Sequence, residues 1–433
     1  MSETICALAT APGGALGIVR ISGPKAFDAV SALCSVNCAS VAPNTIHYTH
    51  ILVPPPTGGG RGKAIDEVMV SVFRAPHSYT GEDSVEISCH GSRYILNKVL
   101  ELLVQQGCRI AGPGEFTMRA YLNGKMDLSQ AEAVADLIAS TNQASHHLAM
   151  SQLRGGISSE LGLLRERLLK LTSLLELELD FSDHEDLEFA DRKELLELAQ
   201  TIDAHITHLA NTFHAGNAIK NGIPVAIIGA PNVGKSTLLN ALLGEERAIV
   251  SDIQGTTRDV IEDTIQLGGI TFRFIDTAGI RRTDDHVELM GIDRSIAAAR
   301  RARIILMMTE PGVPYPDIPV RDDQTVIRIE NKTEVFQAKY GIGLDTLRQQ
   351  LLDAAPKTAD SDIIVTNARH YDALMRAHQS LDKVIEGLQL NMSGDLLSED
   401  LRDVLNILAE ITGGAITPQE TLNNIFKHFC VGK

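Results

Sequence analysis

Apolar residues are spaced in two different ways along the chain. Over residues 1–120, short β-branched runs at Ile18–Ile21, Glu67–Phe73 and Ser84–Ser88 alternate with turn clusters rich in proline and glycine. One amphipathic helix is predicted over Arg93–Gln106. Alternating short strands with a single helix predict a compact α+β domain.

The spacing becomes helical from Asp127 to about Ala215. Leucines recur there at steps of three and four residues, which is typical of the core of a helix bundle; they are Leu161, Leu164, Leu168, Leu171, Leu174 and Leu175. Strand and helix alternate over residues 222–355, and three more helices are predicted between Ala368 and Phe429. The last of these begins at Thr417-Pro418-Gln419-Glu420, a capping sequence. Helices on both sides of an α/β unit predict one domain inserted into another.

The α/β segment contains a phosphate-binding loop. Residues Gly229–Ser236 read Gly-Ala-Pro-Asn-Val-Gly-Lys-Ser, between the predicted strand Val225–Ile228 and the predicted helix Thr237–Leu243. In such a loop, backbone N–H groups surround the phosphates, Lys235 neutralises the β and γ oxygens, and the hydroxyl of Ser236 holds Mg²⁺. The motif in this setting predicts a nucleoside triphosphatase.

Two later segments are predicted to be the switches of a guanine-nucleotide protein: Gly255–Asp259 and Asp276–Gly279. The aspartate of the second switch is expected to hold Mg²⁺ through the metal's shell, and its last glycine to meet the γ-phosphate. Ile280 stands where many such switches carry a water-orienting glutamine. Glu288 is the nearest plausible carboxylate for that role, and from the residues alone a solvated position on a helix surface is its alternative.

The predicted base-reading end is unusual. Asn331-Lys332-Thr333-Glu334 replaces the usual Asn-Lys-x-Asp, and a second loop is predicted at Gln337–Leu344. Only three residues, Glu334–Phe336, separate the two motifs, whereas a parallel crossover takes a dozen or more. We therefore expect that both motifs cannot occupy their usual places. Either the Asn331 motif is displaced, or an edge strand and its helix are missing.

Composition limits the remaining possibilities. The 433 residues suggest about three domains, and neither a secretion signal nor an apolar run near the roughly 20 residues of a membrane span is present, so a cytoplasmic protein is expected. The formal charge of −16 argues against a broad sequence-independent grip on nucleic acid. Cys34 and Cys38 lack a second ligand pair for zinc, and the acidic stretch 180–188 is read as a solvated loop.

Four separated blocks resemble the tRNA-modification GTPase family called MnmE or TrmE. They are Gly17–Gly23 after Thr4-Ile5, Tyr79–Asp83 with His90-Gly91, the stretch from Pro113 to Ala133, and the C-terminal Phe429-Cys430-Val431-Gly432-Lys433. The resemblance covers nearly the whole chain.

This resemblance implies a multidomain α/β and α+β protein. The expected parts are an N-terminal tetrahydrofolate-binding and dimerisation domain at 1–120, a discontinuous helical domain at 121–216 and 361–433, and an inserted Ras-like P-loop G domain at 217–360. It also implies a homodimer that works with an MnmG-type FAD protein. The pair would build an aminomethyl-type group on C5 of the wobble uridine of tRNA, with GTP, Mg²⁺, K⁺ and a tetrahydrofolate derivative as cofactors.

The site residues implied by the resemblance fall into three groups. Arg20, Glu86, Lys125 and Lys433 would line the folate site, with Cys430 near it; from the residues alone, Arg20 and Lys125 would be read as partners in structural salt bridges. Ser236 and Thr257 match the Mg²⁺ ligands, while Asn232, Ser251, Ile253 and Thr256 match the K⁺ ligands. The wider GTP site comprises Asn232, Val233, Gly234, Lys235, Ser236, Thr237, Ser251, Asp252, Ile253, Gln254, Gly255, Thr256, Thr257, Asp276, Thr277, Ala278, Gly279, Asn331 and Lys332.

Glu288 lies twelve residues after Asp276, as the family's catalytic glutamate does. In this reading K⁺ supplies the charge of an arginine finger and Glu288 orients the attacking water. Two alternatives stay open. One is a GTP-dependent binding switch of the ribosome-assembly type, and the other is a weakly active scaffold whose truncated guanine site has lost efficient hydrolysis.

Overall fold

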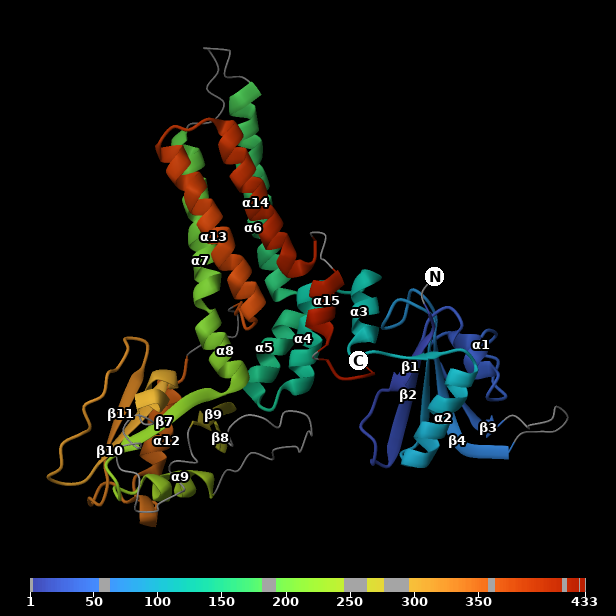
Figure 1. Cartoon of the computed structure of the whole chain (residues 1–433), viewed down its shortest axis with the longest axis horizontal. Helices are drawn as coiled ribbons and strands as arrows, with labels where there is room; N and C mark the ends of the chain where they lie inside the picture. The colour runs from blue at the N-terminus through green and yellow to red at the C-terminus, as the bar shows by residue number, and fades with distance from the viewer. Residues whose placement is uncertain are drawn as a thin grey trace. The chain divides into compact units, whose positions relative to one another are not determined.

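The computed structural model describes residues 3–53, 63–180, 192–244, 263–275, 296–356, 363–414, 419–427 and 429–432 (Figure 1). The chain divides into two compact units. The first comprises Met1–Ile138, Gln152–Ser159 and Leu405–Lys433, and the second comprises Ala139–Ser151 and Glu160–Val404. Within the described ranges, every helix is too short or too polar to cross a membrane.

The first unit is built on a six-stranded sheet with strand order β3-β4-β5-β2-β1-β6. All neighbours are antiparallel except β1 and β6. The strands are β1 (Ile5–Leu8), β2 (Leu16–Ser22), β3 (Thr45–Val53), β4 (Lys63–Phe73), β5 (Ser84–His90) and β6 (Arg109–Ile110). The predicted runs at 18–21, 67–73 and 84–88 are therefore confirmed as strands.

Alternation along these strands decides which side chains enter the core. Val19 and Ile21 are fully buried on β2, as are Val70 and Val72 on β4, because successive side chains point to opposite faces. Helices α1 (Ala26–Ser31) and α2 (Arg93–Gln105) contribute to the same core cluster. The apolar stripe that predicts α2 is its buried face: Leu96, Val99, Leu102 and Leu103.

Three further helices complete this unit: α3 (Glu115–Leu122), α4 (Leu128–Ala139) and α15 (Gln419–Phe426). Leu128 of α4 packs in one cluster with Leu422 and Phe426 of α15 and with Phe429. The C-terminal residues are thereby held against segments that lie about 300 positions earlier in the chain.

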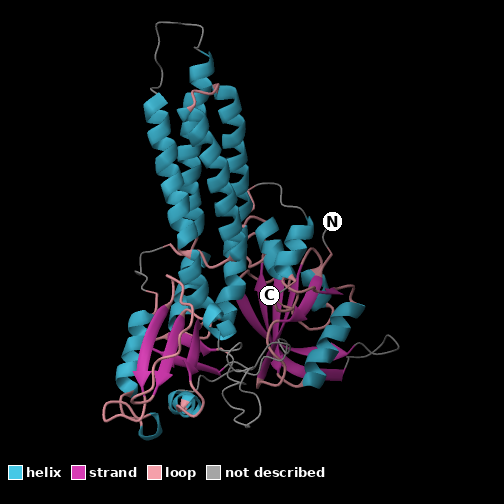
Figure 2. Ribbon diagram, turned by 60° about the vertical axis from the view of Figure 1, so that its left-hand side comes forward, coloured by secondary structure: helices cyan, strands magenta, loops and turns pink. Residues whose placement is uncertain are grey.

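Most of a bundle of long helices belongs to the second unit. They are α6 (Gly156–Asp180), α7 (Arg192–Asn211), α13 (Ala368–Gln389) and α14 (Gly394–Thr412), which run side by side in both views (Figures 1 and 2). The predicted leucine stripe is confirmed as bundle core: Leu161, Leu164, Leu168, Leu171 and Leu175 are buried, and Leu174 is half-buried. Shorter helices α5 (Gln143–Leu153) and α8 (Phe213–Asn221) adjoin the α/β part of this unit.

That α/β part is a five-stranded sheet with order β11-β10-β7-β9-β8. Strands β7 (Ile223–Gly229), β9 (Ile270–Phe274), β10 (Ile304–Thr309) and β11 (Thr325–Glu330) are parallel, while β8 (Asp263–Leu267) is antiparallel to β9. One face packs against α9 (Lys235–Leu243) and α12 (Leu344–Ala354). Residues 296–301 are helical and contribute to the other face.

The chain enters and leaves the α/β part at adjacent points. The Val365 backbone N–H donates to the Thr212 hydroxyl across 2.9 Å. Gly216 of α8 approaches the Val365 carbonyl so closely that a Cβ there would clash. Neighbouring entry and exit points are what a domain inserted into a host needs.

The β8–β9 hairpin is bonded to the start of α5. The Asn142 amide donates to the Thr271 hydroxyl across 2.7 Å, and the Ala144 N–H donates to the Gly269 carbonyl across 3.1 Å. The Gln266 amide adds a 2.7 Å bond to the Thr141 carbonyl. The hairpin is thus tied directly to a helix outside the sheet.

Candidate nucleotide-binding site

The phosphate-binding loop connects the carboxyl end of β7 to the amino end of α9, as its motif predicts. β7 ends at Gly229 and α9 begins at Lys235. Asn232 has φ +61° and Gly234 has φ +100°, in the left-handed region that favours glycine. A Cβ at Gly229 would lie 2.6 Å from the Met308 carbonyl oxygen, so glycine is required where β7 passes β10. The loop therefore places backbone N–H groups and a helix terminus around one point.

Lys235 lies across this loop. Its ammonium group donates to the carbonyl oxygens of Gly229 and Ala230, each at 2.8 Å. Burial lowers the pKa of Lys235 below its ordinary value, because desolvation disfavours the charged form. An anion in the loop would stabilise the charged ammonium form that burial disfavours. This fits the predicted role of Lys235 toward phosphate.

Asn331 joins the two motifs of the predicted base-reading end to the phosphate-binding loop. Its amide nitrogen donates to the Val233 carbonyl across 2.8 Å, and its amide oxygen accepts from the Ala338 N–H at 3.1 Å. Asn331 is 5% exposed. A Cβ at Gly234 would lie 2.5 Å from the Asn331 amide nitrogen, so this glycine permits the approach.

Of the two outcomes expected for the short connection between the motifs, the structure shows the second, in which an edge strand and its helix are missing. β11 ends at Glu330, Asn331 follows at once, and the second loop begins at Gln337 and contains the short 3₁₀ helix η1 (Ala338–Tyr340). Within the fully described stretch 331–343, η1 is the only helix and no strand forms. The edge strand and helix are missing from this stretch. Gly343, at φ +80°, is the N-cap of α12, so α12 follows the second loop directly.

The short connection leaves its middle residues at the surface. Glu334 is exposed, and Val335 is 81% exposed. Lys332 has φ +64° and forms an ion pair with Glu310. Lys332 thus lies beside Asn331 but faces a carboxylate that follows β10.

Several predicted residues lie outside the described residues. They are the first switch with Ser251, Asp252, Ile253, Gln254, Gly255, Thr256 and Thr257, the second switch with Asp276, Thr277, Ala278 and Gly279, and also Glu288 and Lys433. Their roles stay predictions. The acidic stretch 181–188 and the cap at Thr417 lie outside the described residues as well.

A second cluster of predicted residues lies in the first unit, around Arg20. Arg20 on β2 is the register partner of Glu86 on β5, and its Nε lies 2.8 Å from the Glu86 carboxylate. The same guanidinium donates to the Gly432 carbonyl at 3.2 Å and lies 5.4 Å from the centre of the Tyr79 ring. The salt bridge expected from the residues alone is present, and the guanidinium also holds the C-terminal segment.

Lys125 and Cys430 are placed at the edges of this cluster. The Lys125 ammonium donates to the Pro76 carbonyl across 2.9 Å, so Lys125 and Arg20 contact the same loop through Pro76 and Tyr79. The Cys430 thiol is free and exposed, and its carbonyl accepts from the Gly114 N–H at 3.3 Å. Among the described residues, no hydrogen bond or ion pair joins Lys125 to Arg20 or Glu86.

Sequence reasoning missed the role of a charged network beside Arg20. Arg119 donates to Glu82 at 3.0 Å and to Glu115 at 3.0 Å, and Ser22 donates to Glu82 at 2.8 Å. Burial acts to raise the pKa of Glu115, but hydrogen bonds from Arg109, Gly112 and Arg119 outweigh it and hold that pKa below its usual range. The i,i+4 spacing of Glu115 and Arg119 was the available signal.

Among the described residues, one group could hold a metal ion: Asp203, His378 and Asp382, whose ligand atoms lie within 4.8 Å of one another. The two ring nitrogens of His378 face different carboxylates, Nδ1 at 2.6 Å from Asp203 and Nε2 at 3.5 Å from Asp382. An imidazole between two carboxylates is best satisfied as a doubly protonated cation. The hydrogen bond to Asp203 raises the pKa of His378.

Three features define a P-loop nucleotide-binding protein. They are the five-stranded sheet, the loop at the end of β7, and the two Asn331 hydrogen bonds that join this loop to the second loop, here called the Asn331 bridge. Comparison with known sequences places the chain more narrowly. The domain family described as "GTP-binding protein TrmE N-terminus" matches residues 4–125, and the one described as "MnmE helical domain" matches residues 128–430. The chain belongs to the MnmE (TrmE) family.

Relatives match along the full chain. The tRNA modification GTPase MnmE of Phocaeicola vulgatus is 50% identical over 494 aligned positions, which cover 100% of this chain and 99% of that protein. The MnmE of Bacteroides fragilis is 50% identical over 471 positions, with 100% and 99% covered. That of Porphyromonas gingivalis is 46% identical over 474 positions, with 100% and 98% covered. Each alignment is longer than the 433 residues of this chain, so each relative carries residues without a counterpart here.

Proposed function

We propose that this protein is a GTP-hydrolysing tRNA-modification protein that acts on C5 of the wobble uridine. The observation that supports GTP binding is the pair of Asn331 hydrogen bonds, which join the phosphate-binding loop to the predicted base-reading motif. Relatives at 46–50% identity are named tRNA modification GTPases, which supports GTP hydrolysis and tRNA modification.

In this proposal the G domain spans residues 217–360 and is inserted into the helical domain formed by 121–216 and 361–433. The bond between Thr212 and Val365 supports the insertion, because it places the entry and exit of the domain side by side. The N-terminal domain, 1–120, would bind a tetrahydrofolate derivative and form the homodimer. An MnmG-type FAD protein is the proposed partner, tRNA the substrate, and the cytoplasm the location.

The loop residues fit a nucleotide with Mg²⁺. Lys235 would neutralise the β and γ phosphates in place of the two carbonyl oxygens it now contacts. The Ser236 hydroxyl, with Thr257 of the first switch, would hold Mg²⁺, and the loop and α9 would surround the phosphates with N–H groups. Mg²⁺ and K⁺ supply charge that offsets the charge developing on the transferred phosphoryl group.

Asn232 is the described member of the proposed K⁺ set. Asn232 has a φ of +61°, and its side chain is exposed. Its amide oxygen is therefore accessible beside the loop that would hold the phosphates. Ser251, Ile253 and Thr256 would complete the set. Glu288 is the proposed residue that orients the attacking water, because Ile280 has no group able to do so.

Nucleotide state would reach the helices through the β8–β9 hairpin. This hairpin lies in sequence between the two proposed switches, and Thr271 and Gly269 are bonded to Asn142 and Ala144 at the start of α5. A shift in either switch would therefore act on α5 through bonded neighbours.

The folate proposal rests on the surroundings of Arg20. Arg20 and Lys125 contact the same loop, and Arg20 also holds Gly432, which precedes Lys433. A guanidinium beside the Tyr79 and Phe116 rings offers both a carboxylate partner and flat apolar surface to an anionic pteridine derivative.

Isothermal titration with GTP, ATP and 5-formyltetrahydrofolate tests the proposal. We expect binding of GTP and of the folate, with ATP much weaker, and GTP hydrolysis faster in KCl than in NaCl because the smaller Na⁺ fits the same oxygens poorly. Equal hydrolysis rates in the two salts would remove the K⁺ argument. GTP binding without folate binding would favour a GTP-dependent binding switch, and folate binding without measurable GTP binding would favour a weakly active scaffold.

A further inference from the structure

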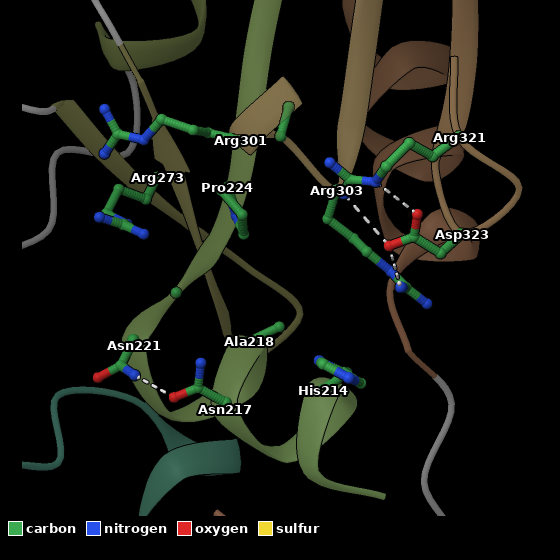
Figure 3. Close-up of a pocket in the computed structure, with 12 residues that line it drawn as sticks. His214, Asn217, Ala218, Asn221, Pro224, Arg273, Arg301, Arg303, Arg321 and Asp323 are labelled. Carbon is green, nitrogen blue, oxygen red and sulfur yellow. Dashed lines mark hydrogen bonds and ion pairs between the residues drawn. The ribbon is translucent and has the colours of Figure 1, made fainter. Parts of the chain in front are cut away.

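A large cavity lies away from the phosphate-binding loop, between α8 and the sheet of the second unit. Its volume is about 840 Å³, within the range of about 300–1,000 Å³ typical of small-molecule sites. Figure 3 shows its lining, which includes Asn217 and Asn221 of α8 on one side and Arg303, Arg321 and Asp323 on another. A single phosphate would fill only a small part of this volume.

The cavity is strongly basic although the protein is acidic. Four arginines and one aspartate line it, so its formal charge is +3 with His214 neutral, while the whole chain carries −16. The arginines come from separate segments: Arg273 from β9, Arg301 and Arg303 from just before β10, and Arg321 from just before β11. Separate parts of the fold thus bring four arginines to one cavity.

Asp323 organises part of this charge. Its carboxylate accepts from Arg321 Nε at 2.8 Å and from Arg303 Nη1 at 3.4 Å. Arg321 also donates from Nη2 to Asp323 at 3.2 Å and from Nη1 to the Arg300 carbonyl, so Arg303, which makes one long contact with Asp323, has more N–H donors to offer a ligand. Planar guanidinium groups match phosphate oxygens in a bidentate manner.

The opposite wall of the cavity is polar and comes from α8. Asn217 and Asn221 are bonded to each other at 2.6 Å, and both side chains are at the surface. An amide offers both a donor and an acceptor, which suits ribose hydroxyls and base edges. The cavity therefore combines groups for phosphate with groups for nucleoside.

This cavity is separate from the GTP site. Pro224, Arg303 and Arg321 lie at or before the amino ends of parallel strands β7, β10 and β11, whereas the phosphate-binding loop follows the carboxyl end of β7. The two sites are at opposite edges of the same sheet. A ligand here is a second anion and not the hydrolysed nucleotide.

We propose that this cavity binds the phosphate backbone of RNA, and that it holds part of the tRNA substrate. The proposal rests on the proposed function, which supplies tRNA as the substrate. An acidic protein repels RNA at long range, so a local pocket that gathers four arginines and two amides is where close contact costs least.

The test compares matched variants in tRNA binding by fluorescence anisotropy over a range of salt concentrations. Arg303→Gln/Arg321→Gln removes two cavity arginines. Arg348→Gln/Arg376→Gln is the control, because each of these arginines also pairs with an aspartate within one helical turn but lies outside the cavity lining. We expect the cavity variant to bind tRNA at least about tenfold more weakly near 0.1 M salt. The slope of the logarithm of the binding constant against the logarithm of salt concentration should be smaller in magnitude by about 1.5, because each lost phosphate contact removes about 0.7–0.9 from it. The control should match the wild type.

A second variant leaves the arginines intact. Asn217→Glu places a carboxylate on the exposed face of α8 that lines the cavity, and Gln349→Glu, on the exposed surface of α12, adds the same charge elsewhere. We expect only Asn217→Glu to weaken tRNA binding, and circular dichroism and thermal unfolding check that each variant is folded.

The outcomes separate the possible occupants. If wild type binds tRNA and both cavity variants bind it equally well, the proposal is overturned while the proposed function stands. If wild type itself binds no tRNA, the tRNA part of the proposed function fails first. If inorganic phosphate or AMP raises the unfolding temperature of wild type but not of Arg303→Gln/Arg321→Gln, while tRNA affinity is equal in all, the cavity serves a free phosphate compound and the RNA proposal is wrong.

Discussion

Replacing Asn331 with alanine should uncouple the phosphate-binding loop from the second loop. Two bonds are lost, one to the Val233 carbonyl at 2.8 Å and one from the Ala338 N–H at 3.1 Å. Val233 and Ala338 are each 2% exposed, so water does not readily replace the missing partner. An unsatisfied buried group costs about 1–3 kcal/mol, so we expect a total of about 2–6 kcal/mol for the two groups.

Hydrogen exchange and nucleotide titration measure this cost separately. A loss of about 2 kcal/mol corresponds to roughly 30-fold faster opening, since 1.4 kcal/mol is a factor of ten, so the Ala338 amide should exchange at least about 30-fold faster in Asn331→Ala. GTP affinity should fall by at least about tenfold. Glu334→Ala is the control, because Glu334 is exposed and its loss should change local stability by less than about 0.5 kcal/mol. Unchanged exchange at Ala338 together with GTP affinity within twofold of wild type would refute the reasoning.

Three further predictions concern other sites. Arg20→Ala should weaken 5-formyltetrahydrofolate binding by about 10- to 150-fold, the equivalent of a charge-assisted contact of roughly 1.5–3 kcal/mol; unchanged affinity in a folded variant would sink the folate assignment. Glu288→Ala should slow single-turnover GTP hydrolysis in KCl by about two to four orders of magnitude and leave GTP binding nearly intact; a rate within about threefold of wild type would show that Glu288 does not act on the water. His378 has a pKa raised by its hydrogen bond to Asp203, so its stabilising contribution is complete below the unfolded pKa of about 6.5 and is lost as pH rises through the folded pKa. The unfolding temperature of the helical bundle should therefore fall from pH 6 to pH 9, and Asp203→Asn should flatten this dependence; equal slopes in the two proteins would contradict it.

Local patterns predicted most of the secondary structure because the physics that selects each element acts over a few residues. The strands of the N-terminal sheet and the leucine stripe of α6 follow from period-two and helical spacing. The phosphate-binding loop was predicted equally well, since its residues are contiguous in sequence and Gly234 answers to local backbone geometry, a φ of +100°.

The base-reading end was harder because it depends on elements that the chain lacks. A three-residue connection signals a missing strand and helix, but it does not say that Asn331 keeps its place. That outcome depends on long-range bonds to Val233 and Ala338, which no local pattern encodes.

Long-range assembly also hid the two charged clusters. Glu82 and Arg119 lie 37 positions apart in sequence, and the cavity arginines at 273, 301, 303 and 321 are gathered only when β9, β10 and β11 pair with their neighbours. Sequence spacing of isolated arginines carries no sign of such a convergence.

The modification state of tRNA tests the central claim most directly. The chain would be expressed in a bacterium that lacks its own MnmE-type protein and retains the MnmG-type partner, and nucleosides from purified tRNA would be measured by mass spectrometry. The account predicts that C5-substituted wobble uridine returns with this chain and not with its Lys235→Ala variant, which loses the phosphate-binding cation. Unmodified wobble uridine in the presence of folded wild-type chain, under conditions where a relative restores the modification, would contradict it.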